Sequence, residues 1–202
     1  MEQPRLNMGE CFENGFRLYK ENMLILIPAT FIALLLSLVS AGILAGPMLT
    51  GLFMSALGLL RRKDPKPEVL DVFNGFRFFL NAAIFFLGWG LVVTGGCLIL
   101  FLLPGVGHLV MLFFIYAAQA FLMFGPFLIL DQGMDFREAS FTSINRIKGD
   151  FWPFLSVSAV AGVIGSIGLV AFGIGVVVTF PIQVCILTVT YEAVLGRSNA
   201  VK

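Results

Sequence analysis

Apolar positions along the chain form three long blocks instead of short alternating patterns. Residues 22–60, 78–130 and 151–191 contain no Asp, Glu, Lys or Arg, over 39, 53 and 41 residues respectively. One helix that crosses a membrane needs about 20 apolar residues. Each block is therefore long enough for two spans and too long for one. Transmembrane strands are not favoured, because they alternate apolar and polar residues over about ten positions.

Each apolar block also contains helix-breaking residues near its middle. Gly stands within 42–47, 103–108 and 172–175, and Pro within the first two of these stretches; both residues favour turns. The pattern predicts an all-α membrane protein with six transmembrane helices arranged as three hairpins. We expect the first span to be retained, because the first 21 residues hold four acidic and three basic residues, whereas a cleaved signal peptide has a short basic start.

A polar stretch precedes each predicted hairpin. In each stretch apolar side chains recur at helical spacing and charged side chains face elsewhere, which is typical of short amphipathic helices at a membrane interface. Asn7 with Glu10, and Asp135 with Glu138, are spaced as in a capping box. The alternative is that each stretch is only the frayed entry of a span.

The three polar stretches resemble one another. The tetrapeptide at 14–17, Asn-Gly-Phe-Arg, recurs at 74–77, and a shift of 128 positions pairs Asn22 with Asp150. We interpret the chain as one polytopic membrane domain over 1–202 with a pseudo-threefold repeat. Parallel repeats occur in some transporters, but duplication of a stable hairpin with no transport explains the pattern equally well. The repeat-like units cover about 7–62, 67–131 and 135–196.

Composition and charge agree with a membrane location. The chain is 58% hydrophobic and 12% charged, against about 45–50% and about 25% in soluble domains. This excludes a disordered protein, a nucleic-acid binder and an ordinary cytosolic enzyme. All 13 basic residues lie outside the three apolar blocks, and loops rich in Lys and Arg stay in the cytoplasm. We expect a multi-pass protein of the cytoplasmic (inner) membrane, with both termini and every charged stretch in the cytoplasm.

Residues that could carry catalysis are scarce. His108 is the only histidine, and Cys11, Cys97 and Cys185 lack the close spacing of metal or redox pairs. Nucleotide-binding and hydrolase motifs are absent from the sequence. We expect no enzymatic activity, no catalytic or metal site and no cofactor.

Two groups of residues are candidates for membrane interactions. Four basic residues directly after the predicted second span are candidate contacts to lipid headgroups, although they could serve only to orient the chain. Two glutamines in the predicted fourth and sixth spans are candidate intramembrane polar contacts. A bond between helices is the default for such an amide, and contact with a solute is the alternative. These residues are Arg61, Arg62, Lys63 and Lys66, and Gln119 and Gln183.

Small residues recur at every fourth position in two of the predicted spans. They are Pro47, Gly51 and Ser55 in the second span, and Ser158, Gly162 and Ser166 in the fifth. Such stripes allow two helix backbones to approach closely. The spacing predicts tight helix packing, either within one chain or between subunits.

Short motifs along most of the chain carry a family resemblance. They are Gly15-Phe16, Gly46-Pro47 with Gly51, the stretch Asp71-Val72-Phe73-Asn74-Gly75-Phe76, Leu103-Pro104-Gly105, and Asp131 with Ala139 and Ser143. The chain resembles uncharacterised six-span bacterial and archaeal membrane-protein families, which include the membrane domain attached to some glycerophosphodiester phosphodiesterases. The resemblance implies an inner-membrane protein of undefined function. It implies no phosphodiesterase activity, since no acidic-His cluster is present, and it assigns no functional residue.

From these observations we expect a structural or accessory protein that organises lipid or partner proteins at the cytoplasmic face. The alternative is a small-solute transporter or channel, which a polar cavity between the fourth and sixth spans would favour. The expected partners are membrane lipids, other membrane proteins or further copies of the chain, and not nucleic acid.

Overall fold

The computed structural model describes residues 7–103, 106–169 and 175–196, and these residues form helices and no strands. The all-α prediction is therefore confirmed for the part of the chain that the structure describes. The helices are α1 (Met8–Val39), α2 (Ala45–Leu60), the 3₁₀ helix η1 (Val69–Phe78), α3 (Phe79–Phe101), α4 (Gly107–Leu122), α5 (Gly125–Gln132), α6 (Phe136–Lys148), α7 (Phe151–Ile167) and α8 (Val176–Val194).

Four helical segments are long and apolar enough to cross a membrane. They are α1, η1 with α3, α4 with α5, and α8. The pair α6 and α7 adds a fifth if it counts as one span, although the two helices meet at a bend of 112°. The remaining apolar helix, α2, has only 16 residues. Length and composition therefore give four or five candidate spans of a membrane-embedded protein.

The helices break where the apolar blocks predicted turns. α1 ends at Val39 and α2 begins at Ala45, and in the turn between them Ala41 and Gly42 have positive φ angles of 51° and 87°. The other two breaks separate α3 from α4 and α7 from α8. Parts of these two predicted turns, residues 104–105 and 172–174, lie outside the described residues.

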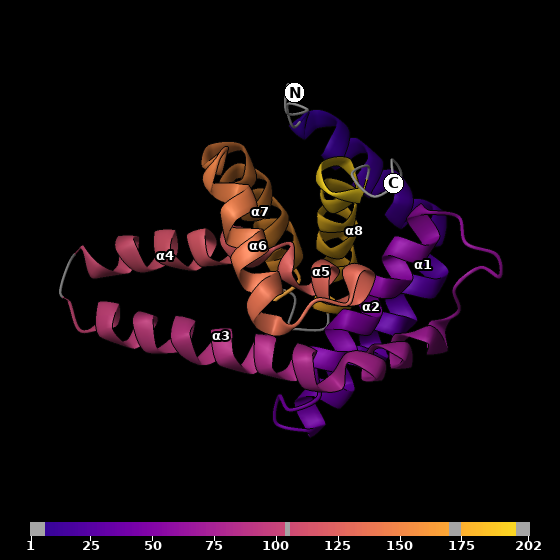
Figure 1. Cartoon of the computed structure of the whole chain (residues 1–202), viewed down its shortest axis with the longest axis horizontal. Helices are drawn as coiled ribbons and strands as arrows, with labels where there is room; N and C mark the ends of the chain where they lie inside the picture. The colour runs from indigo at the N-terminus through magenta and orange to yellow at the C-terminus, as the bar shows by residue number, and fades with distance from the viewer. Residues whose placement is uncertain (1–6, 104–105, 170–174, 197–202) are drawn as a thin grey trace.

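The short α2 lies at the centre of the molecule and packs against α1, η1, α3 and α8. Most of its residues are buried, Met48, Leu52 and Ala56 completely. α7 and α8 stand side by side, whereas α3 and α4 extend together away from the other helices and run crosswise to α7 and α8 (Figure 1). Large apolar side chains on α3 and α4 are consequently exposed at the molecular surface.

The three amphipathic stretches are helical, and each meets its following apolar helix at a change of direction or helix type. α1 is kinked at Asn22, where φ is −130° and ψ is 17°. Asp150, between α6 and α7, has a φ of −138° and a ψ of 56°. The second stretch is the 3₁₀ helix η1, which continues directly into α3.

Neither predicted capping box forms. The Asn7 side chain makes no bond to the helix backbone and instead donates to the Glu10 carboxylate at 2.9 Å. Asp135 likewise makes no capping hydrogen bond. Side-chain pairing competes with capping in the first case, because the Asn7 amide reaches the Glu10 carboxylate directly. At the start of η1, by contrast, the Asp71 carboxylate accepts a hydrogen bond of 2.8 Å from the Glu68 backbone N–H.

Both small-residue stripes include positions of close packing within the chain. Gly51 on α2 and Gly75 on η1 lie so close to the opposing backbone that a Cβ on either would overlap with it. A Cβ at Gly162 on α7 would lie 2.9 Å from Oε1 of Gln119 on α4. Of the two packing alternatives, these contacts establish the one within a single chain.

Candidate functional site

Arg61, directly after α2, connects three helices at the charged end of the molecule. Its guanidinium donates to both carboxylate oxygens of Asp131 on α5, at 2.6 and 2.9 Å, and to Glu192 on α8, where Nε lies 3.0 Å from Oε2. The Tyr191 hydroxyl donates to Asp131 at 2.9 Å. We call these four residues the Arg61 cluster.

The Arg61 cluster is partly buried, and in it one guanidinium pairs with two carboxylates. The side chains of Arg61, Asp131 and Glu192 are 28%, 15% and 31% exposed. A carboxylate near a helix C-terminus meets the negative end of the helix dipole, so Asp131 and Glu192 both need a neighbouring cation. The hydrogen bonds to Asp131 raise the pKa of Arg61 further above its usual value, against the opposing effect of burial. The geometry therefore favours a role in joining helices.

The other three predicted basic residues lie together in the loop that follows α2. Arg62, Lys63 and Lys66 line a pocket of about 310 Å³ with Glu21 and Asn22 of α1. We call this the basic pocket. All three basic side chains are exposed, and among the described residues none of them forms an ion pair. Three cations and one carboxylate leave the pocket with a net positive charge that suits a phosphate or another anion.

The basic pocket lies beside the kink of α1. Asn22 is where the amphipathic part of α1 meets its apolar part, and its amide donates to the Leu18 carbonyl at 2.9 Å. Gly58 of α2 also lines the pocket. An anion in this pocket would thus lie level with the boundary between the polar and apolar parts of α1.

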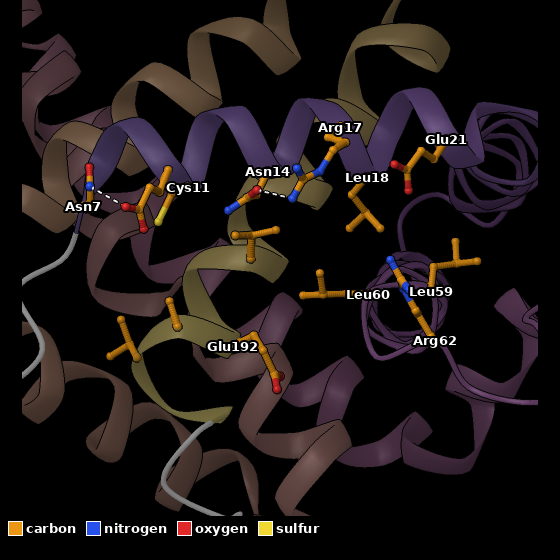
Figure 2. Close-up of a pocket in the computed structure, with 14 residues that line it drawn as sticks. Asn7, Cys11, Asn14, Arg17, Leu18, Glu21, Leu59, Leu60, Arg62 and Glu192 are labelled. Atoms are coloured by element: carbon orange, nitrogen blue, oxygen red, sulfur yellow. Dashed lines mark hydrogen bonds between the residues drawn. The ribbon is translucent and has the colours of Figure 1, made fainter.

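A larger polar cleft of about 580 Å³ lies between the amphipathic part of α1 and the ends of α2 and α8 (Figure 2). Glu10, Arg17 and Glu21 line it from α1, Arg62 lines it next to α2, and Glu192 lines it from α8. Both charge signs are present, so the cleft has no single preference for an anion or a cation. Its residues bring the first charged stretch of the sequence beside the second and the last.

The two predicted intramembrane glutamines pack on the same helix. Gln119 on α4 contacts Gly162 of α7, and Gln183 on α8 contacts Gly165, one turn further along α7. Neither glutamine lines the basic pocket or the polar cleft. A role for either in binding a solute stays a prediction, and their positions are those of contacts between helices.

The sequence pattern predicts a lipid contact for Arg61 and does not predict its pairing with Asp131 or Glu192. Its guanidinium is directed at these carboxylates, so a lipid contact for Arg61 also stays a prediction. A signal for the pairing was nevertheless present. Arg61, Asp131 and Glu192 are each the first charged residue after one of the three apolar blocks, which places them at similar depth at the ends of neighbouring helices.

The residues that the structure describes contain no group of three or more His, Cys, Asp or Glu side chains that could hold a metal ion. His108 lies in the first turn of α4, with its ring 5.5 Å from that of Phe101. Comparison with known proteins assigns no family, since no protein-family model, curated protein or solved structure matches the chain.

Proposed function

We propose that the protein is a non-enzymatic accessory protein of the cytoplasmic membrane that binds anionic lipid headgroups at the cytoplasmic face. The basic pocket is the observation that carries this proposal. Arg62, Lys63 and Lys66 form no ion pair with other described residues and share one pocket. Basic residues beside a span attract anionic headgroups with about 1 kcal/mol each.

The proposal includes six membrane-embedded segments in three hairpins, with both termini in the cytoplasm. The helix breaks between α1 and α2, α3 and α4, and α7 and α8 support it. At 16 residues α2 is about 24 Å long, short of a membrane core of about 30 Å, but it is shielded by its neighbours.

A threefold repeat and the family resemblance belong to the same proposal. The order of a polar segment followed by two apolar segments supports the repeat. The segments are the two parts of α1 on either side of its kink with α2, then η1 with α3 and α4–α5, then α6 with α7 and α8. The non-helical φ/ψ angles of Asn22 and Asp150, the two residues paired by the shift of 128 positions, also support it. The resemblance to the six-span families agrees with this order, and it suggests no activity beyond a membrane role.

Transport of a small solute is not the function that the observed contacts favour. A solute pathway would need polar groups facing a cavity inside the membrane region. Gln119 and Gln183 instead contact Gly162 and Gly165 of α7, as expected of amides that connect helices.

Lipid analysis of a triple variant tests the proposed function. Arg62, Lys63 and Lys66 are replaced together by Gln, and Arg61 is kept because it holds Asp131 and Glu192. The purified protein is examined by native mass spectrometry in a mild detergent. We expect less co-purified anionic phospholipid than with the unaltered protein, at equal expression and thermal stability.

The matched control replaces three other basic residues, Arg17, Lys20 and Lys148, with Gln, which removes the same charge outside the basic pocket. We expect this variant to retain more anionic lipid than the first. Equal lipid content in the first variant and the unaltered protein, with folding intact, would refute headgroup binding by the basic pocket. An inverted topology with unchanged lipid content would show that the cluster serves only for orientation.

A further inference from the structure

An apolar groove lies away from the basic pocket, where α6 crosses α3. The two helices form a groove of about 320 Å³ with almost entirely apolar walls. Gly88 and Trp89 line it from α3, and Arg137, Ser140 and Phe141 line it from α6. We call this the α3–α6 groove, and its volume is within the range of small-ligand sites, about 300–1,000 Å³.

The groove has a fixed wall and an open floor. The Trp89 indole donates to the Ser140 hydroxyl at 2.9 Å, and that hydroxyl donates to the Phe136 carbonyl at 2.6 Å. These bonds hold the indole against α6. At Gly88 an added Cβ would meet no atom within 4 Å, so the floor is free of protein.

The surroundings of the groove indicate that it faces lipid and not water. α3 belongs to a candidate membrane span, and only 6% of its apolar window is buried inside the protein. Ile84 and Val92, on either side of Gly88, are exposed, as is Phe141 on α6. Apolar surface of this extent on a membrane span is covered by lipid chains and not by water.

One charge stands in the groove wall. Arg137 is the only charged residue among the described residues that line it, and its guanidinium lies 5.7 Å from the centre of the Phe136 ring. α6 is amphipathic and begins at Phe136, so Arg137 lies in its first turn, next to the apolar groove. A cation beside an apolar groove matches a molecule with a hydrocarbon chain and a negative head.

We propose that the α3–α6 groove binds one anionic phospholipid, with an acyl chain against Gly88 and Trp89 and the phosphate at Arg137. A zwitterionic lipid fits less well because its own cationic group competes with Arg137 for the phosphate. The site is separate from the basic pocket and does not depend on it. It makes the hairpin of α3 and α4 a lipid-bound part of the molecule.

Fluorescence of Trp89 tests the proposal directly. The chain has two tryptophans, and Trp152, which is 69% exposed, is replaced by Phe. The protein is placed in phosphatidylcholine bilayers that contain brominated phosphatidylglycerol or brominated phosphatidylcholine at equal mole fraction. Bromine quenches an indole that it contacts. We expect stronger quenching by the anionic lipid, corresponding to about fivefold tighter binding.

Two variants in the Trp152→Phe background separate chain binding from headgroup binding. Arg137→Gln should abolish the preference for the anionic lipid while leaving Trp89 accessible to both. Gly88→Leu should fill the groove and reduce quenching by both lipids. Gly90→Leu is its matched control, because Gly90 is equally open but does not line the groove, and it should leave the quenching unchanged.

Three outcomes would overturn the proposal. They are absence of quenching in the Trp152→Phe protein, equal quenching by both lipids, and either an anionic preference that persists in Arg137→Gln or undiminished quenching in Gly88→Leu. Replacement of Arg62, Lys63 and Lys66 by Gln should not alter the quenching of Trp89. Loss of lipid binding at the basic pocket and at the α3–α6 groove can therefore be told apart.

Discussion

Single glycines decide how closely the helices of this protein approach one another. Gly51 and Gly75 allow α2 and η1 to contact backbone to backbone, and Gly162 accommodates the amide of Gln119. Other glycines, such as Gly88 and Gly95 on α3, have open space where a side chain would be. The same residue type thus marks either a close contact or an uncovered surface, and only the neighbouring helix distinguishes the two.

Replacement of Gly162 by Leu should destabilise the protein, because the new side chain would enter the contact with Gln119. Overpacking of this kind costs roughly 1–3 kcal/mol. The measurement is thermal unfolding in detergent. Gly95→Leu is the control, since a Cβ at Gly95 meets no atom within 4 Å and the gain in helix propensity is the same. If both variants unfold at the same temperature, the α7 contact is not a tight one.

The sequence was sufficient to predict where these stripes of small residues lie, but not what they contact. Spacing of four residues identifies one face of a helix. The partner of that face depends on how distant segments fold together, as with Gln119 and Gly162. The Arg61 cluster is a similar case, because Arg61 is 70 residues from Asp131 and 131 residues from Glu192 in the sequence.

At the scale of helices, the amphipathic part of α1 is docked on α8 and does not lie free at an interface. Gly15 faces Ile186, and a Cβ on Gly15 would lie 2.9 Å from the Ile186 Cα atom. Cys11, on the same face of α1, is only 3% exposed. Apolar periodicity predicted the helix, but it could not show that the buried face contacts protein.

Gly15→Ala should weaken the docking of α1 on α8, because the methyl group would overlap with the Ile186 backbone. We expect Cys11 to react faster with a thiol reagent in detergent, in a background where Cys97 and Cys185 are replaced by Ala. Gly9→Ala is the control, since its Cβ would meet only the Asn7 side chain, at 3.5 Å. An unchanged labelling rate in Gly15→Ala would mean that α1 is not held through this glycine.

At the scale of the whole molecule, the charged stretches gather although they are far apart in the sequence. The Arg61 cluster joins the second, third and last stretches, and the polar cleft adds the first through Glu10 and Arg17. That hairpins return each charged stretch to the same side of a membrane stays a prediction. The charge pattern could not predict that α3 and α4 run crosswise to α7 and α8 (Figure 1).

Accessibility of introduced cysteines should distinguish the two sides of the membrane. In a chain whose native cysteines are replaced by Ala, a cysteine at Ile43 or Val106, both exposed in turns between helices, should react with an impermeant reagent outside intact cells. A cysteine at Lys63 or Arg137 should react only after the cells are permeabilised. Labelling of position 63 in intact cells would exclude three hairpins with both termini inside.

The order in which the ribosome makes the chain gives Arg61 two successive roles. Its partners Asp131 and Glu192 follow 70 and 131 residues later. At a translation rate of about 5–20 residues per second, Asp131 is made roughly 4–14 s after Arg61, and Glu192 roughly 7–26 s after it. In the proposed topology, Arg61 is an unpaired cation beside the newly made α2 during that interval, and its charge favours keeping this end of the first hairpin in the cytoplasm. The same side chain later binds Glu192 on the last helix, so Arg61 contributes to orientation together with Arg62, Lys63 and Lys66 early in synthesis, and to joining the helices at its end.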